Sequence, residues 1–179
     1  NIVASAGYYF ERFFPDYVRE LTEAQLTERI TREVEEGVDG TDVRAGTIGE
    51  TGNSNGEITA VEQKVFRAAG RSQRQTGACV ITHTDVGRFG TDQLDLLEAG
   101  GADPARVLIG HMDCTSDTDA QMAVVKRGAF IGFDRISLVQ GIFGLYQTDE
   151  ARVNSIVRLV ERGYARQIIL SHDLARKSR

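Results

Sequence analysis

Apolar, β-rich runs alternate with helix-like segments along the whole chain, and four of the runs end in a carboxylate or an imidazole. The six runs lie at residues 2–5, 43–50, 79–84, 107–111, 129–134 and 167–173. The helix-like segments lie at residues 15–36, 59–75, 91–99, 117–127 and 149–162. Strands that alternate with helices pair in parallel through right-handed crossovers. The pattern therefore predicts an α/β fold built on a parallel sheet.

Local signals support these element boundaries. The stretch Thr59-Ala60-Val61-Glu62 is a capping box, which predicts the start of a helix. A glycine follows each helical segment, where a left-handed residue often ends a helix. These glycines are Gly37, Gly77, Gly100, Gly128 and Gly163. No low-complexity linker interrupts the pattern, so we expect residues 1–179 to form a single domain.

The polar strand ends distinguish a barrel from an open sheet. They are Glu50, His83, His111 and Asp173. An open doubly wound sheet gathers its ligands around one switch point. Candidates spread over four of six strands converge only if the sheet curls into a ring, with the strand ends on the active-site face. The sequence therefore predicts a (β/α)8 TIM barrel, of which this chain supplies six strands.

Two imidazoles and two carboxylates at one face suit a divalent transition metal such as zinc. All three histidines of the chain sit at strand ends, which favours a metal site. Each candidate also has a simpler interpretation. His83 and His111 could be hydrogen-bonded strand-end histidines, Asp173 a helix N-cap and Glu50 an exposed loop acid. Gly49 would let the backbone beside Glu50 approach a neighbouring group closely.

The same residues predict a reaction class. Two metals ~3.5–4 Å apart can share a hydroxide, lower its pKa and polarise a substrate oxygen. Asp173 at the rim would then take or deliver the proton. The chain has no Gly-x-Ser-x-Gly motif and no Gly-x-Gly-x-x-Gly motif after a strand, so neither a serine nucleophile nor a dinucleotide is expected. We therefore expect metal-dependent hydrolysis of an ester-like bond.

Composition restricts the partners and the cellular compartment that we expect. The net charge of -5 and the lack of a long basic stretch argue against a nucleic-acid partner. No apolar run approaches the ~20 residues that cross a bilayer. Cys79 and Cys114 lie far apart without metal-binding spacing, which fits a reducing cytoplasm better than a disulfide scaffold. Both ends look cut, so we expect part of a longer protein.

Five stretches carry a specific resemblance. They are residues 43–50, 76–84, 106–113, 131–135 and 167–173. With these stretches the chain resembles the phosphotriesterase family of the amidohydrolase superfamily. The resemblance implies a (β/α)8 barrel with two divalent ions, zinc being expected before manganese, cobalt or iron. It also implies that His83 and His111 bind the more exposed ion and Asp173 the more buried one.

Glu50 would bridge the two ions. Many members of the family use a carboxylated lysine there, so Glu50 resembles the glutamate-bridged branch. The buried ion's other ligands come from a His-x-His motif on the first strand, which is absent here. The resemblance thus implies that the chain begins at the third strand and ends in the loop after the eighth. A homodimer is expected for the full-length protein.

Two further residues bear on the substrate. Tyr9 matches a position where lactonase-like members often have tyrosine, and Arg135 also matches a lactonase-like pattern. Tyr9 could instead pack in the core, and Arg135 could form a surface ion pair with Asp134. We expect a carboxylic ester or lactone as the small-molecule substrate, with phosphotriester hydrolysis as a promiscuous side activity.

Two rival functions stay open at this point. A metal-dependent deoxyribonuclease of the same superfamily also uses Glu, His, His and Asp on successive strands. The acidic charge balance and the motif matches count against it. A non-catalytic binding protein on the same barrel is the second rival. The retention of all four ligand-type residues counts against that one.

Overall fold

Six parallel strands form one sheet in which spatial order equals chain order. The computed structural model describes residues 2–53, 56–137 and 147–173. The strands are β1 (Ala4–Ala6), β2 (Ala45–Gly52), β3 (Cys79–His83), β4 (Val107–Gly110), β5 (Phe130–Phe133) and β6 (Ile168–Leu170). Each strand pairs in parallel with the next, in the order β1-β2-β3-β4-β5-β6. The predicted α/β fold with a parallel sheet is confirmed.

Within these described ranges, six α-helices connect the strands. They are α1 (Tyr17–Glu20), α2 (Glu23–Glu35), α3 (Ala60–Thr76), α4 (Gly90–Ala99), α5 (Thr118–Lys126) and α6 (Asp149–Glu161), and short 3-10 turns lie between them. The single helix expected at residues 15–36 is wrong, because the chain is extended at Leu21 and Thr22. Thr22 then starts α2 with a capping box to Gln25, which satisfies free amides at the new helix start.

The predicted helix ends are only partly correct. Thr59 and Glu62 form the expected capping box of α3, and Gly77 ends that helix in the left-handed conformation. Gly100 is right-handed, with φ -75°, and the left-handed residue is Gly101, with φ 94°. Gly100 is needed for another reason. A Cβ atom there would lie 2.3 Å from the carbonyl oxygen of Arg67, so glycine allows close approach to α3.

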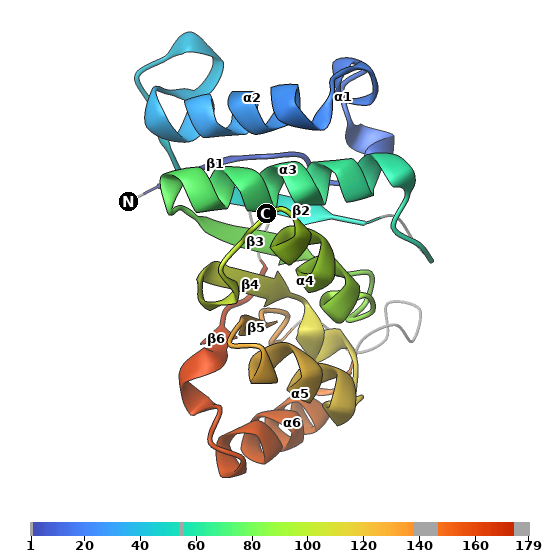
Figure 1. Cartoon of the computed structure of the whole chain (residues 1–179). Coiled ribbons are helices and arrows are strands. Elements are labelled where there is room, and N and C mark those ends of the chain that lie inside the picture. Colours follow the sequence, from blue (N-terminus) through green and yellow to red (C-terminus); the bar gives the residue numbers. More distant parts are fainter. Residues whose placement is uncertain (1, 54–55, 138–146, 174–179) are drawn as a thin grey trace, which may run out of the picture.

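The helices cover the sheet in the manner of a barrel wall. Consecutive helices from α2 to α6 pack against one another, and Figure 1 shows them following each other in chain order along the sheet. Neighbouring helices on one face and strands in chain order are the arrangement of a (β/α) barrel, whereas a doubly wound sheet reverses its strand order. In the described residues the sheet is open, with β1 and β6 at its edges. It is thus a partial barrel.

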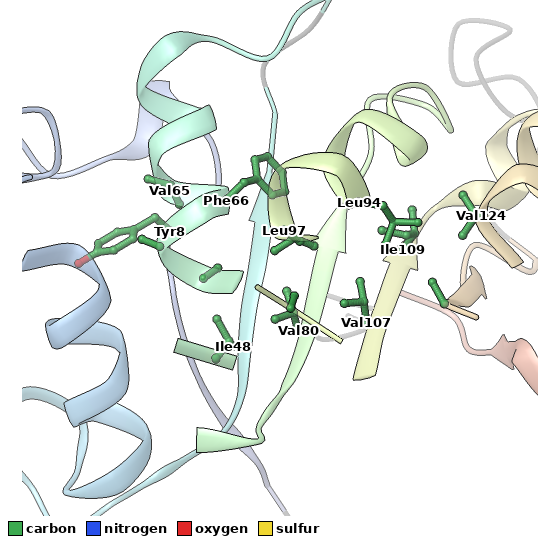
Figure 2. Close-up of a cluster of buried hydrophobic side chains, with 14 of the residues drawn as sticks. Tyr8, Ile48, Val65, Phe66, Val80, Leu94, Leu97, Val107, Ile109 and Val124 are labelled. Carbon is green, nitrogen blue, oxygen red and sulfur yellow. The ribbon is translucent and has the colours of Figure 1, made fainter. Parts of the chain in front are cut away.

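The core lies between the strands and these helices. Ile48, Val80 and Val107 are paired across β2, β3 and β4, and all three are buried. Figure 2 shows them beside Phe66 of α3 and Leu97 of α4, which are fully buried. Within the described residues, no helix is both long and apolar enough to cross a membrane. The core fixes the strands and therefore the side chains that leave their carboxyl ends.

Candidate metal centre

Glu50 reaches the site because β2 is irregular. Strict alternation would turn Glu50 to the same face as buried Ile48, against the helices. The register between β2 and β3 shifts after Ile48, and Gly49 has φ 131°. A Cβ atom at Gly49 would lie 2.1 Å from the carbonyl oxygen of Ile81, so the expected close approach is confirmed. Such irregularities re-aim side chains beside active sites.

His83 follows the ordinary alternation of a strand. Val80 and Thr82 of β3 are buried, so His83 at the end of that strand points to the opposite face. Gln93 of α4 holds its backbone, since the Gln93 side-chain amide donates to the His83 carbonyl at 2.9 Å. The same amide donates to the side-chain oxygen of Asn53 at 2.7 Å. The end of β3 is therefore fixed by a buried polar network.

His111 needs a change of backbone conformation. Alternation after buried Ile109 would direct it toward the helices. His111 is instead left-handed, with φ 59°, directly after β4. Non-glycine residues in this region carry strain and cluster at functional sites. With the left-handed backbone at His111, the His111 ring lies beside His83, and the ring centroids are 4.3 Å apart.

The three side chains converge on one point. His111 Nε2 lies 3.1 Å from Glu50 Oε1, and His83 Nδ1 lies 3.5 Å from Glu50 Oε2. The two ring nitrogens are 2.7 Å apart. One donor atom from each residue falls within 4.8 Å of the others. Among the described residues, this is a group of imidazole and carboxylate donors close enough to share a metal ion.

Asp134 completes the surroundings of His111, although the sequence reasoning did not select it as a site residue. His111 Nδ1 donates to Asp134 Oδ1 at 2.7 Å, and the His111 backbone amide donates to Oδ2 at 3.0 Å. The bond at Nδ1 leaves Nε2 directed at Glu50, which is the usual support for a metal-binding histidine. The sequence does contain an indication of this role, since Asp134 directly follows a buried strand, β5, as the ligand candidates follow theirs.

Charges within the group are strongly coupled. Burial alone would lower the pKa of His111, but hydrogen bonds to Asp134 and Glu50 raise it to about 9. Burial alone would raise the pKa of Glu50, but the hydrogen bonds from His111 and His83 lower it to about 2. Burial lowers the pKa of His83 below its usual value. Without a cation, the group thus pairs an ionised carboxylate with a charged His111.

Tyr9 lines this group and is not simply a core residue. Its hydroxyl lies 3.1 Å from His83 Nδ1, and its ring is stacked on Phe10. Burial, followed by the nearby Glu50 carboxylate, raises the pKa of Tyr9 to about 12. The hydroxyl therefore stays protonated at neutral pH and can donate a hydrogen bond.

Asp173 and Arg135 lie together beside the group. Arg135 Nε is 3.4 Å from Asp173 Oδ2, and the Arg135 side chain is 11% exposed. Arg135 is therefore not a surface residue, as the alternative of a surface ion pair with Asp134 would require. Asp173 lies outside the tight cluster of three donors, but it is close enough to raise the pKa of Tyr9 electrostatically. Its ligand role stays a prediction.

The donor set fits a divalent transition metal. Imidazole nitrogen and carboxylate oxygen are ligands that zinc and its neighbours accept. The hydrogen bond at His111 Nδ1 fixes the ring with Nε2 facing the other donors. Glu50, His83 and His111 would hold the ion, and Asp134 would orient one of its ligands.

Comparison with known proteins finds relatives over almost the whole chain. The chain is 39% identical over 178 residues to the phosphotriesterase homology protein of Escherichia coli, covering 99% of the chain and 59% of that protein. It is 33% identical over 189 residues to an N-acetyltaurine hydrolase of Dictyostelium discoideum, covering all of the chain and 50% of that protein. The chain thus spans between half and three fifths of the length of these relatives.

Solved structures give the same result. A crystal structure of the Escherichia coli protein with phosphate in its active site matches with a TM-score of 0.92 and 39% identity, over 99% of this chain and 60% of that one. A mutant of a Deinococcus radiodurans lactonase of phosphotriesterase type matches with a TM-score of 0.87 and 41% identity, over 96% and 54%. The model of the phosphotriesterase family matches residues 1–179, and the chain therefore belongs to that family.

Proposed function

We propose that this chain forms most of the active site of a metal-dependent hydrolase that cleaves carboxylic esters or lactones. The convergence of Glu50, His83 and His111 at the carboxyl ends of three adjacent strands carries the proposal. Family membership supports it, since the similar proteins include a hydrolase and a lactonase. Family membership also favours an ester or lactone hydrolase over a deoxyribonuclease or a binding protein without catalysis.

Each residue has a defined task in this proposal. Glu50, His83, His111 and Asp173 would hold the divalent ions. Bound divalent ions lower the pKa of a coordinated water and polarise a substrate carbonyl. Asp173 accepts the proton released during attack and returns it to the leaving group. Its exposed fraction of 38% leaves the carboxylate accessible to a substrate.

Tyr9 and Arg135 bind the substrate. The protonated Tyr9 hydroxyl, beside His83, donates a hydrogen bond to a substrate oxygen. Arg135, which lies against Asp173, supplies positive charge where negative charge develops on the substrate. Tyr9 stacks with Phe10 and Phe13, and this aromatic surface can accept an apolar substituent of an ester or lactone. Phosphotriester hydrolysis is proposed as a side activity of the same site.

A substrate screen tests the proposal directly. The purified full-length protein is loaded with zinc, manganese or cobalt and assayed on lactones, carboxylic esters and organophosphates. N-acetyltaurine is included because a relative is an N-acetyltaurine hydrolase. We expect hydrolysis of lactones or esters that stops on chelation and returns with added metal.

Variants identify the source of any activity. His111→Asn should abolish the metal-dependent activity, whereas Asp95→Asn, an exposed acid on α4 that pairs with Arg127, should not. Activity that survives chelation or His111→Asn would refute the metal-dependent mechanism. Metal-dependent turnover of N-acetyltaurine alone would retain the hydrolase and replace the ester substrate by an amide.

A further inference from the structure

Three consecutive residues after β5 are held through their backbone by three different side chains. Arg135 donates its amide to Asp113 Oδ2 at 3.0 Å. The carbonyl of Ile136 accepts from His172 Nδ1 at 3.0 Å. Ser137 donates its amide to Asp149 Oδ1 at 3.1 Å. These contacts come from the segments that follow β4 and β6 and from the start of α6. They hold residues 135–137 against three separate parts of the fold.

A single buried arginine joins two of these anchors. Arg152 of α6 places Nε 3.0 Å from Asp113 Oδ2 and Nη1 2.7 Å from Asp149 Oδ1. Its side chain is 2% exposed, and that of Asp113 is fully buried. The planar guanidinium can contact two carboxylates through fixed donors, which a lysine ammonium does less well.

This buried pair is poorly suited to stability alone. A buried ion pair is often no more stable than apolar residues of similar size. Asp113 Oδ1, Arg152 Nε and Arg152 Nη2 are buried without a hydrogen-bond partner in the part of the chain that the structure describes, so the contact between Arg152 Nε and Asp113 is an ion pair without hydrogen-bond geometry. A network that is only partly satisfied costs free energy. The position of the Asp113–Arg152 pair suggests a role at the metal centre. Asp113 lies two residues after His111, and Arg135, whose amide it binds, directly follows Asp134.

We propose that Asp113, Arg152 and Asp149 form a charged anchor that positions Arg135 against Asp173 for substrate binding. The three are positioning residues, and they act through the backbone of residues 135–137. The inference rests on the proposed role of Arg135 in substrate binding. If it is correct, weakening the anchor loosens the backbone of the segment and impairs substrate binding only while Arg135 is present.

Hydrogen exchange tests the anchor without any substrate. Asp149→Ala removes an exposed carboxylate, and Glu150→Ala is its matched control, since it removes the same charge from the adjacent exposed position. Asp149→Ala should speed exchange of the Ser137 amide by about 10-fold or more. Arg152→Met should do so for both Ser137 and Arg135, and Arg152→Lys should recover part of the protection. Unchanged exchange in folded Asp149→Ala would overturn the anchor even if Arg152→Met does not fold.

Kinetics test whether the anchor works through Arg135. On the substrate that the screen identifies, Asp149→Ala and Arg152→Met should raise KM by roughly 10-fold with a smaller change in kcat, the pattern of lost binding. In an Arg135→Ala background the same changes should have no further effect on KM. An equal rise of KM in both backgrounds would refute the positioning role. If no substrate is hydrolysed at all, the proposed function fails, while the exchange experiment still decides the anchor.

Discussion

Removing the Asp134 side chain should weaken metal binding although Asp134 is not assigned as a ligand. Asp134→Ala deletes the acceptor of a 2.7 Å hydrogen bond from His111 Nδ1 and of a 3.0 Å bond from the His111 amide. A hydrogen bond to a charged group contributes roughly 1.5–3 kcal/mol, and each 1.4 kcal/mol is about tenfold in affinity. We therefore expect metal affinity to fall about 10–100-fold, which is the usual range for such supporting residues.

Asp134→Asn should lose nearly as much. Both carboxylate oxygens accept from His111, so an asparagine must place its NH2 group against one of these donors. Metal affinity is measured by competition with a zinc-binding dye at fixed pH, and a thermal melt with chelator checks that each variant is folded. Asp95→Asn is the control acid away from the site. Wild-type affinity in a folded Asp134→Ala protein would refute the supporting role of Asp134.

Four further predictions concern catalysis, proton release on metal binding, the pH dependence of stability and the core. Asp173→Asn should lower kcat by ~10²–10⁴ with both metals bound, because asparagine cannot accept the proton. The control is Ser171→Ala rather than a His172 variant, because His172 contacts Ile136. Near wild-type turnover of Asp173→Asn would make Asp173 a structural residue. Because the pKa of His111 is about 9 without a cation, metal binding at pH 7 should release about one proton and strengthen as pH rises toward 9, as calorimetry in buffers of different ionisation enthalpy will show. In the metal-free protein the stability from this raised pKa is full below pH 6.5 and lost as pH rises through 9, which a pH series of melts detects. Phe66→Ala should destabilise by ~3–5 kcal/mol in urea unfolding, with exposed Val153→Ala near neutral.

Several parts of the site and fold could be predicted from local sequence. The apolar runs and their helical spacing predict strands and helices because burial on one or both faces imposes these periods. His83 lies at the end of such a run and follows its alternation, so its place on the functional face was accessible from the pattern. The capping box at Thr59 is likewise local, since its partners are three residues apart.

Other features depended on contacts between distant segments. Alternation alone would send Glu50 and His111 toward the helices, and only the irregularity at Gly49 and the left-handed His111 bring them to His83. Arg135 lies against Asp173, which is distant in the sequence, because the end of β6 lies beside β5 in the sheet.

The sequence by itself determined which residue types stand at the strand ends, and hence the class of chemistry. It did so because the period of a strand is set by residues close together in the chain. Only the tertiary structure decided which of these side chains meet and which carboxylate supports His111. Those outcomes are set by strand register, local backbone conformation and helix packing, which depend on residues far apart in the chain.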